Sequence, residues 1–252
     1  MTKTRLELRR DGCVAHVFLA APKANVLDAT MISELDTIFE SLERRRDLCA
    51  IVLEADGPNF SFGASVAEHL PEQIEPALAR LGALLRRVTA APAPVIAAVR
   101  GQCLGGGLEL VLACDLIVAE ENAQLGVPEI RLGVFPPAAS ALLPARVGVA
   151  FASSLILTGA SVSGTDAMAK GLVARTAPAG QLATAIEAFL EESFLPRSAT
   201  AVRYAALAVR RAIVRALEED LPALDRLYLD GLMREEGAAD GIRAFLEKKA
   251  PA

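Results

Sequence analysis

The sequence predicts an α/β fold followed by a helical C-terminal region. Over residues 1–120, short apolar stretches typical of strands alternate with stretches in which apolar residues recur every three or four positions. This alternation is typical of helices that cover a sheet. After about residue 138 the signals are nearly all helical. We therefore expect a core over residues 1–196 and a helical region over residues 197–252, with the boundary at Pro196.

The first elements follow from local patterns. Residues 4–20 contain two apolar stretches joined by an Asp-Gly turn at 11–12, which predicts a hairpin. Asp28 is a helix-capping residue type, and it precedes a stretch, 31–42, whose apolar residues share one helical face. Residues 49–57 then predict a buried strand that ends at a turn.

The following elements surround a glycine cluster. A helix is predicted over residues 74–88, and a short apolar strand follows two prolines in the stretch 91–101. Residues 101–107 are expected to form a loop with three consecutive glycines. This loop leads into a helix at 108–114, and 116–119 is again a strand.

Composition and charge exclude two classes of protein. The chain has 252 residues and a net charge of −5, which argues against nucleic acid as a partner. Its most apolar stretch, 95–119, is interrupted by Arg100, Glu109 and Asp115, so we expect no membrane span. The N-terminus lacks an apolar signal segment, which predicts a cytoplasmic protein.

Cysteine and histidine offer little chemistry of their own. The four cysteines have no CxxC spacing and there are only two histidines, so we expect free thiols and no metal site. Cys103 adjoins the glycine loop without a basic partner, which argues against a nucleophilic role. His69 follows a loop and is expected to lie on the surface or to line a pocket rather than to catalyse.

Two loops bring backbone N–H groups within reach of a ligand. Residues 60–65 and 104–109 both carry glycine, which has no side chain to block an approach. The second loop runs into a helix, so its N–H groups lack intrahelical partners and lie at the positive end of the helix. Two N–H groups that converge on one point form an oxyanion hole. A tight turn without a ligand is the alternative that the glycines alone leave open.

Two glutamates lie close to these loops in the sequence. Glu109 is surrounded by apolar residues, and a buried carboxylate is costly unless it is paired, protonated or retained for function. Glu129 follows Pro128 at a predicted helix start, where ordinary capping or an ion pair with Arg131 would be structural explanations. Together the two carboxyl groups could act as general acid and general base on one substrate.

These motifs resemble the crotonase family, the enoyl-CoA hydratase/isomerase superfamily. The resemblance covers almost the whole chain and is most specific over residues 97–136. It implies a spiral of ββα units with a helical C-terminal region that assembles into trimers, commonly as a dimer of trimers. Outside the central block, the segments that carry the resemblance are APKANVLDATM (21–31), NFSFGASVAEH (59–69), LTGASVSGTDAMAKGLV (157–173) and GIRAFLEKKAP (241–251).

The resemblance also implies roles for individual residues. The backbone N–H groups of Ala64 and Gly106 would hold a thioester oxygen, and Glu109 and Glu129 would be the catalytic acid and base. Coenzyme A would arrive as part of the substrate, with no separate cofactor or metal, and Lys248 could meet its phosphates. The positions expected to lie along coenzyme A are Lys23, Ala24, Ser65, Val66 and Ala67.

One stretch departs from the family pattern. Residues 136–148, PPAASALLPARVG, replace a glycine-rich stretch that would line the acyl pocket. We therefore expect a reshaped pocket. Together with KANVLDA (23–29) and NFSFGASVAEHLP (59–71), this stretch resembles family members that hydrate a conjugated, cyclic acyl-CoA of the kind formed in the breakdown of aromatic acids, and the resemblance implies that activity here. An enoyl-CoA isomerase on the same scaffold and a non-catalytic acyl-CoA-binding paralogue are the alternatives, and the two intact glutamates argue against the second.

Overall fold

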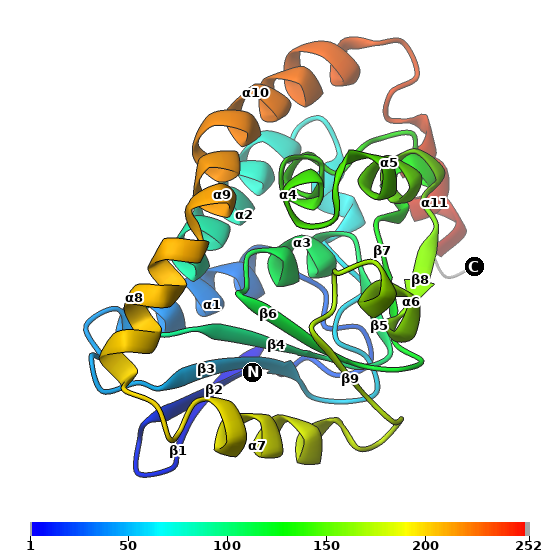
Figure 1. Cartoon of the computed structure of the whole chain (residues 1–252). Helices are drawn as coiled ribbons and strands as arrows, with labels where there is room; N and C mark the ends of the chain where they lie inside the picture. Colours follow the sequence, from blue (N-terminus) through cyan, green and yellow to red (C-terminus); the bar gives the residue numbers. More distant parts are fainter. Residues whose placement is uncertain (1, 250–252) are drawn as a thin grey trace.

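A six-stranded sheet forms the centre of the molecule (Figure 1). The computed structural model describes residues 2–249. Strands β1 and β2 are antiparallel, and every other neighbouring pair in the order β1-β2-β3-β4-β6-β9 is parallel. The strands of this sheet are β1 (Thr4–Arg9), β2 (Val14–Leu19), β3 (Ala50–Ala55), β4 (Val95–Val99), β6 (Leu116–Glu120) and β9 (Arg175–Ala177).

Helices cover both faces of this sheet, which explains its apolar central strands. Alternate residues of a strand point to opposite faces. Val52 and Ile96 accordingly pack in a cluster with α7 (Leu182–Ser193), which lies alone below the sheet in Figure 1. Their neighbours Ile51 and Val95 pack in the main core on the other face. That face is covered by α1 (Ala29–Leu42), α2 (Ile74–Thr89), α3 (Gly106–Leu112) and α4 (Pro137–Val147).

Three short strands form a second sheet. They are β5 (Gln102–Leu104), β7 (Gln124–Gly126) and β8 (Ser161–Ser163); β5 and β7 are parallel, and β7 and β8 are antiparallel. The chain enters β5 directly after β4 and enters β7 soon after β6. The pairs β4/β6 and β5/β7 are both parallel, so the chain leaves β5 and β7 in the same direction. The helix α3 and the short helix η2 (Pro128–Leu132), which follow these two strands, therefore start side by side.

The expected fold class and most of the expected elements are confirmed. The hairpin is present, and the Asp28 side chain caps α1 by accepting a hydrogen bond from the Met31 N–H at 3.0 Å. Two expectations were wrong: part of the 101–107 loop forms β5, and β8 and β9 lie in the region that was expected to be helical. Strands of three residues are too short to show an alternating pattern.

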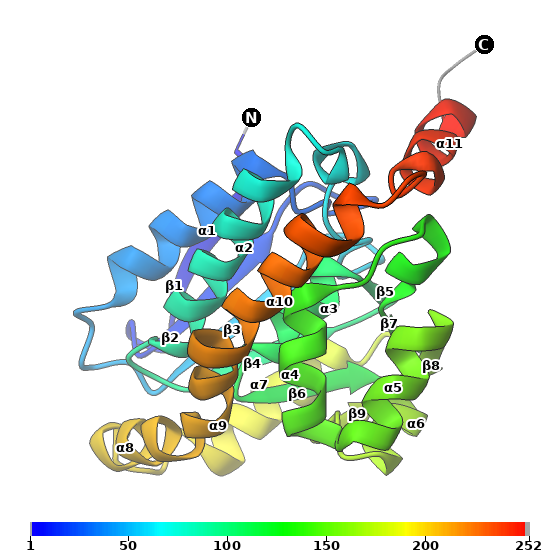
Figure 2. The ribbon, with the colours of Figure 1, turned by 90° about the horizontal axis from the view of Figure 1, so that it is seen from above.

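The C-terminal part is helical almost without interruption between residues 199 and 234 and passes between α2 and α4 (Figure 2). No helix within residues 2–249 is long and apolar enough to cross a bilayer. Pro196 lies between α7 and α8, and its role as a boundary stays a prediction. The remaining elements are η1 (Val66–His69), α5 (Val149–Thr158), α6 (Gly164–Ala169), α8 (Ala199–Val209), α9 (Arg211–Arg215), η3 (Ala216–Asp220), α10 (Leu221–Arg226), η4 (Leu227–Gly231), η5 (Leu232–Arg234) and α11 (Asp240–Lys249).

Arg210 anchors this C-terminal part to the core. Its side chain is 5% exposed and makes a two-point ion pair with Asp115, with Nε–Oδ1 and Nη2–Oδ2 distances of 2.8 and 2.6 Å. The same guanidinium donates to the carbonyl oxygens of Thr89, Ala91 and Ala93. These hydrogen bonds therefore join the end of α8 to the segment between α2 and β4 and to Asp115, which lies between α3 and β6.

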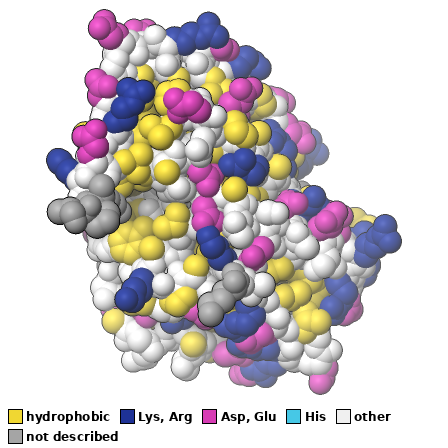
Figure 3. Space-filling model, turned by 180° about the vertical axis from the view of Figure 1, so that it is seen from behind, with side chains coloured by type: hydrophobic (Ala, Val, Ile, Leu, Met, Phe, Trp, Pro, Cys, Tyr) yellow, Lys and Arg dark blue, Asp and Glu magenta, His cyan; other side chains and the backbone are white. Residues whose placement is uncertain are grey.

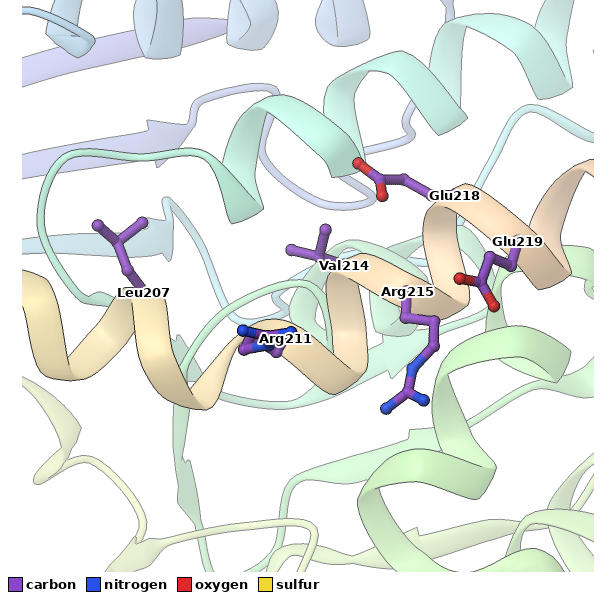
Figure 4. A pocket seen from close by; sticks show the side chains of 6 residues that line it. All are labelled: Leu207, Arg211, Val214, Arg215, Glu218 and Glu219. Carbon is purple, nitrogen blue, oxygen red and sulfur yellow. The ribbon is translucent and has the colours of Figure 1, made fainter.

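The next residue, Arg211, lies on the outer side of the same segment. It lines a hollow of about 570 Å³ together with Leu207, Val214 and Glu218 (Figure 4). None of the predicted site residues lines this hollow. Arg211 therefore provides an exposed arginine next to the buried one.

Replacing Arg210 with Met is expected to lower the free energy of unfolding by about 3–5 kcal/mol, because it leaves Asp115 buried without its ion-pair partner. Urea unfolding followed by circular dichroism measures this change. The matched control is Arg211→Met, which should change the same quantity by less than about 0.5 kcal/mol. Equal effects of the two substitutions would contradict the anchoring role.

Candidate active site

The glycine cluster packs directly against the loop that follows β3. A Cβ on Gly106 would lie 2.9 Å from the Ala64 nitrogen, and a Cβ on Gly107 would lie 2.7 Å from Ser61 Cβ. Gly105 has φ +50°, and a Cβ there would collide with the Glu129 carboxyl group. Only glycine combines this close approach with a positive φ. The three glycines thus bring two loops and Glu129 into contact.

Two backbone N–H groups at this contact have no partner. Neither the Ala64 nor the Gly106 N–H donates to an acceptor in the part of the chain that the structure describes. Ser61 fixes the first loop, because its hydroxyl donates to the Asn25 carbonyl oxygen at 2.8 Å and accepts from the Gly63 N–H at 3.0 Å. The structure therefore brings together the two residues expected to supply an oxyanion hole, with both donors available.

Glu109 lies in α3 and is 5% exposed. Its Oε1 accepts a hydrogen bond from the Ala139 N–H at 2.9 Å, which belongs to the first turn of α4. Burial raises the pKa of Glu109 to about 7, although the N–H groups of Ala139 and Ala138 favour the charged form. The stretch 136–148 thus does more than shape a pocket, because the start of α4 holds this carboxyl group.

Glu129 lies in η2 and is 8% exposed. Its Oε2 has no hydrogen-bond partner, and no ion pair joins it to Arg131 among the described residues. Burial, followed by repulsion from Glu109, raises the pKa of Glu129 to about 8. Two neighbouring buried carboxyl groups do not readily both ionise, so burial and mutual repulsion favour a protonated form of at least one of them near neutral pH.

A groove of about 890 Å³ leads to these residues. All five positions expected to contact coenzyme A line it, as do Ala64 and Glu129. Lys248 does not line the groove, whereas Phe245 and Leu246 of the same helix, α11, do. The structure therefore joins the segments around residues 23–26 and 62–67 in one groove that ends at a glutamate.

A smaller cavity of about 30 Å³ adjoins the inner end of the groove, which is room for about one water molecule. Glu109 and Glu129 both line it, together with His69, Phe135 and Tyr228. Tyr228 was not predicted from the sequence. It sits in an apolar helical stretch more than 90 residues after Glu129 in the chain, so no local pattern separates it from a core residue.

His69 lies where the groove meets the cavity and lines both. Its Nδ1–H donates to the Ser65 carbonyl oxygen at 2.9 Å, so its Nε2 is left as the acceptor of the neutral ring. Burial lowers the pKa of His69, which favours this neutral form. Of the two expected locations, the pocket lining is the one observed.

Comparison with known proteins decides the family. Residues 9–252 match the family described as Enoyl-CoA hydratase/isomerase. This chain belongs to the enoyl-CoA hydratase/isomerase family. It is 43% identical over 243 residues to the cyclohexa-1,5-dienecarbonyl-CoA hydratase of Thauera aromatica. The aligned region covers 96% of this chain and 93% of the relative.

Solved structures of the enoyl-CoA hydratase/isomerase family share the fold. An enoyl-CoA hydratase from Mycobacterium avium subsp. paratuberculosis superposes with a TM-score of 0.85 at 25% identity, over 99% of this chain and 98% of the other. One from Mycobacterium smegmatis superposes with a TM-score of 0.78 at 30% identity, over 99% and 98%. The family resemblance and the fold expected from it are thus confirmed.

The raised pKa of Glu129 predicts how stability depends on pH. The carboxyl group binds its proton more tightly in the folded protein, with a pKa of about 8 against 4.5, so its contribution to stability is complete below pH 4.5 and is lost as the pH rises through 8. Replacing Glu129 with Gln removes this loss. The variant should therefore exceed the wild type in free energy of unfolding by on the order of 5 kcal/mol at pH 8.5 and nearly match it at pH 4.5.

Urea unfolding at pH 4.5, 6.5 and 8.5 measures this difference. The control is Glu121→Gln, which removes an exposed carboxylate and should leave the pH dependence of the wild type unchanged. A constant difference between wild type and the Glu129 variant across the three pH values would show that this carboxyl group does not titrate as described.

Proposed function

We propose that this protein adds water to a conjugated, unsaturated acyl-CoA thioester. One observation carries the proposal: two buried carboxyl groups with raised pKa values line a cavity of about 30 Å³, beside two backbone N–H groups that have no partner among the described residues. Membership of the enoyl-CoA hydratase/isomerase family supports the same activity, as do relatives named as hydratases. Coenzyme A enters as part of the substrate, and no separate cofactor takes part.

The reaction follows from where charge develops. A water oxygen bonds to a carbon of the conjugated double bond, and the displaced electron pair moves onto the thioester oxygen. The N–H groups of Ala64 and Gly106 stabilise that negative charge; removing one such donor typically costs about 10²–10³ in rate. The ionised carboxyl group takes a proton from the water, and the protonated one gives its proton to carbon. One water is added, and the total number of protons on the pair is unchanged.

We propose that Glu109 and Glu129 form this acid–base pair, in roles that the two pKa values leave interchangeable. Their pKa values of about 7 and about 8 suit acid–base catalysis, since a proton donor or acceptor works best when its pKa lies near the operating pH. Lys23 and Arg131, the two cationic residues that line the groove, are suited to the phosphates of coenzyme A.

The acyl group that we propose is cyclic. The chain is 43% identical to a relative whose name gives cyclohexa-1,5-dienecarbonyl-CoA as its substrate. In addition, the stretch that departs from the family pattern places Pro136 and Pro137 in the lining of the cavity and fixes Glu109 through Ala139. The corresponding reaction converts a cyclohexadiene-carbonyl-CoA, of the type formed in the breakdown of aromatic acids, to a hydroxycyclohexene-carbonyl-CoA.

A screen of cyclic and linear enoyl-CoAs in H₂¹⁸O tests the proposal. Hydration removes the conjugation of a linear enoyl-CoA and shortens that of a cyclic dienoyl-CoA, so the thioester absorbance changes in both, and it adds one ¹⁸O to the product mass. An isomerase would move the double bond without adding oxygen, and an acyl-CoA-binding protein would change neither. Faster turnover of linear than of cyclic substrates would overturn the cyclic assignment while leaving hydration in place.

Replacing Glu109 or Glu129 with Gln is expected to lower kcat by at least about 10³-fold, because each substitution removes a proton donor or acceptor at the reacting carbon or water. Acyl-CoA affinity, measured by calorimetry with a saturated acyl-CoA, should change by less than about threefold. Glu121→Gln is again the control and should turn over like the wild type. Near-normal kcat in either active-site variant would remove that glutamate from the mechanism.

We also propose that the chain forms homotrimers, with the possibility of paired trimers. The exposed helix α8 carries Leu207 and Val209 with 46% and 72% of their surface exposed, so these apolar side chains are available for contact with a second subunit. Hydrophobic side chains also gather on the rear face of the molecule, between charged ones (Figure 3). Surface of this kind is suited to contacts between subunits.

The double variant Leu207→Glu/Val209→Glu is expected to reduce the mass in solution from three times the 26.5 kDa of one chain, or a multiple of that, to a single chain. Buried charge is costly at an apolar interface, which is the reason for this expectation. Light scattering after size exclusion gives the mass. Leu8→Glu, on β1, is the control and should keep the assembly. An assembly that survives the double variant would contradict a role for α8.

A further inference from the structure

The hydroxyl group of Tyr228 is a buried polar group in the lining of the cavity. The residue is 1% exposed, and its oxygen has no hydrogen-bond partner within residues 2–249. Its ring is held firmly by apolar neighbours: Phe135, at 5.3 Å between ring centroids, and the core residues Ile74, Val134 and Ile242. A buried hydroxyl without a partner costs about 1–3 kcal/mol, so a polar group that is fixed in this way calls for a ligand.

Tyr228 shares the cavity with the acid–base pair. Glu109, Glu129 and Tyr228 all line the same space of about 30 Å³. Burial and then the two glutamates raise the pKa of Tyr228, so its hydroxyl stays protonated and remains a hydrogen-bond donor. Of the other polar neighbours, Glu68 is bound by Arg80 and by the Ala29 N–H. His69 donates through Nδ1 to the Ser65 carbonyl oxygen and keeps Nε2 as an acceptor, so it has no N–H to donate into the cavity.

The hydrogen-bonding capacity of one water matches this cavity. A water molecule has two hydrogens and two lone pairs. Both hydrogens can go to oxygens of Glu109 and Glu129, including the unpartnered Oε2 of Glu129. One lone pair must stay free to attack carbon, and the other can accept from a donor. Tyr228 is the protonated hydroxyl that lines the cavity, and it therefore suits that remaining position.

We propose that Tyr228 donates a hydrogen bond to the oxygen that is added to the substrate, as water before the addition and as the new hydroxyl of the product afterwards. This inference rests on the proposed hydration. It makes Tyr228 a residue that selects for an oxygen at one position of the acyl group. It also gives the C-terminal helical region a direct part in the site of its own chain, through η4.

Tyr228→Phe tests the inference, because it removes only the hydroxyl. Two inhibition constants are measured from initial rates of hydration: one for the hydroxylated acyl-CoA product, and one for cyclohexane-carbonyl-CoA, which lacks the hydroxyl. The variant should bind the product about 10-fold more weakly, the size expected for one lost hydrogen bond, and the saturated analogue within about twofold of the wild type. The kcat for hydration should fall by about 10–100-fold with KM nearly unchanged.

The matched control is Tyr204→Phe, which removes the hydroxyl of a tyrosine that is 64% exposed on α8 and should change none of these constants. Thermal unfolding adds an independent measurement. Because the Tyr228 hydroxyl has no partner in the protein, its removal should leave the melting temperature unchanged or raise it. A hydroxyl with a purely structural role would instead lower it.

Two results would overturn the inference. Equal weakening of product and saturated analogue would indicate a change of shape rather than a lost contact with oxygen, and unchanged constants for both would show that Tyr228 touches neither. If wild-type protein hydrates enoyl-CoA and either result is found, only the role of Tyr228 is wrong. If wild-type protein takes up no ¹⁸O, the proposed function fails, and the role of Tyr228 fails with it.

Discussion

The close contact between the glycine cluster and the loop after β3 is the constraint on which the site depends. With any side chain on Gly106 or Gly107, the two backbones could not approach as they do, and the N–H groups of Ala64 and Gly106 would separate. Gly105 extends the same constraint to Glu129, whose carboxyl group fills the space that a Cβ would occupy. Three glycines therefore set the position of both donors and of one carboxyl group.

The two buried carboxyl groups form the costly part of this arrangement. Burial raises the pKa of each, and their proximity adds to the shift of Glu129. The structure offsets part of this cost for Glu109 through the first N–H groups of α4, whereas Oε2 of Glu129 has no hydrogen-bond partner among the described residues. Stability is thus lost at the pair of carboxyl groups that we propose as acid and base, and perturbed pKa values of this kind are typical of functional sites.

The elements with strong local signals were predictable. A capping residue before one-sided apolar spacing predicted α1, and the apolar run after two prolines predicted β4. Strands β5, β7 and β8 have three residues each, and they are strands because they pair with one another, not because of their own sequences. The resemblance to the family predicted the positions of both glutamates in the site. No sequence pattern marked Tyr228, because only the path of the C-terminal helices brings it to the cavity.

By itself, the sequence determined the alternation of strands and helices, the glycine loop and the improbable carboxylate inside an apolar helix, since each follows from the chemistry of neighbouring residues. The tertiary structure alone decided that the Ala64 and Gly106 N–H groups lie together and that Tyr228 lines the cavity. It also decided that the charged neighbour of Glu129 is Glu109, which repels it, and not Arg131. The physical reason is distance. Electrostatic repulsion, desolvation and close backbone approach act between groups that are neighbours in space, and the groups of this site come from four separate parts of the chain.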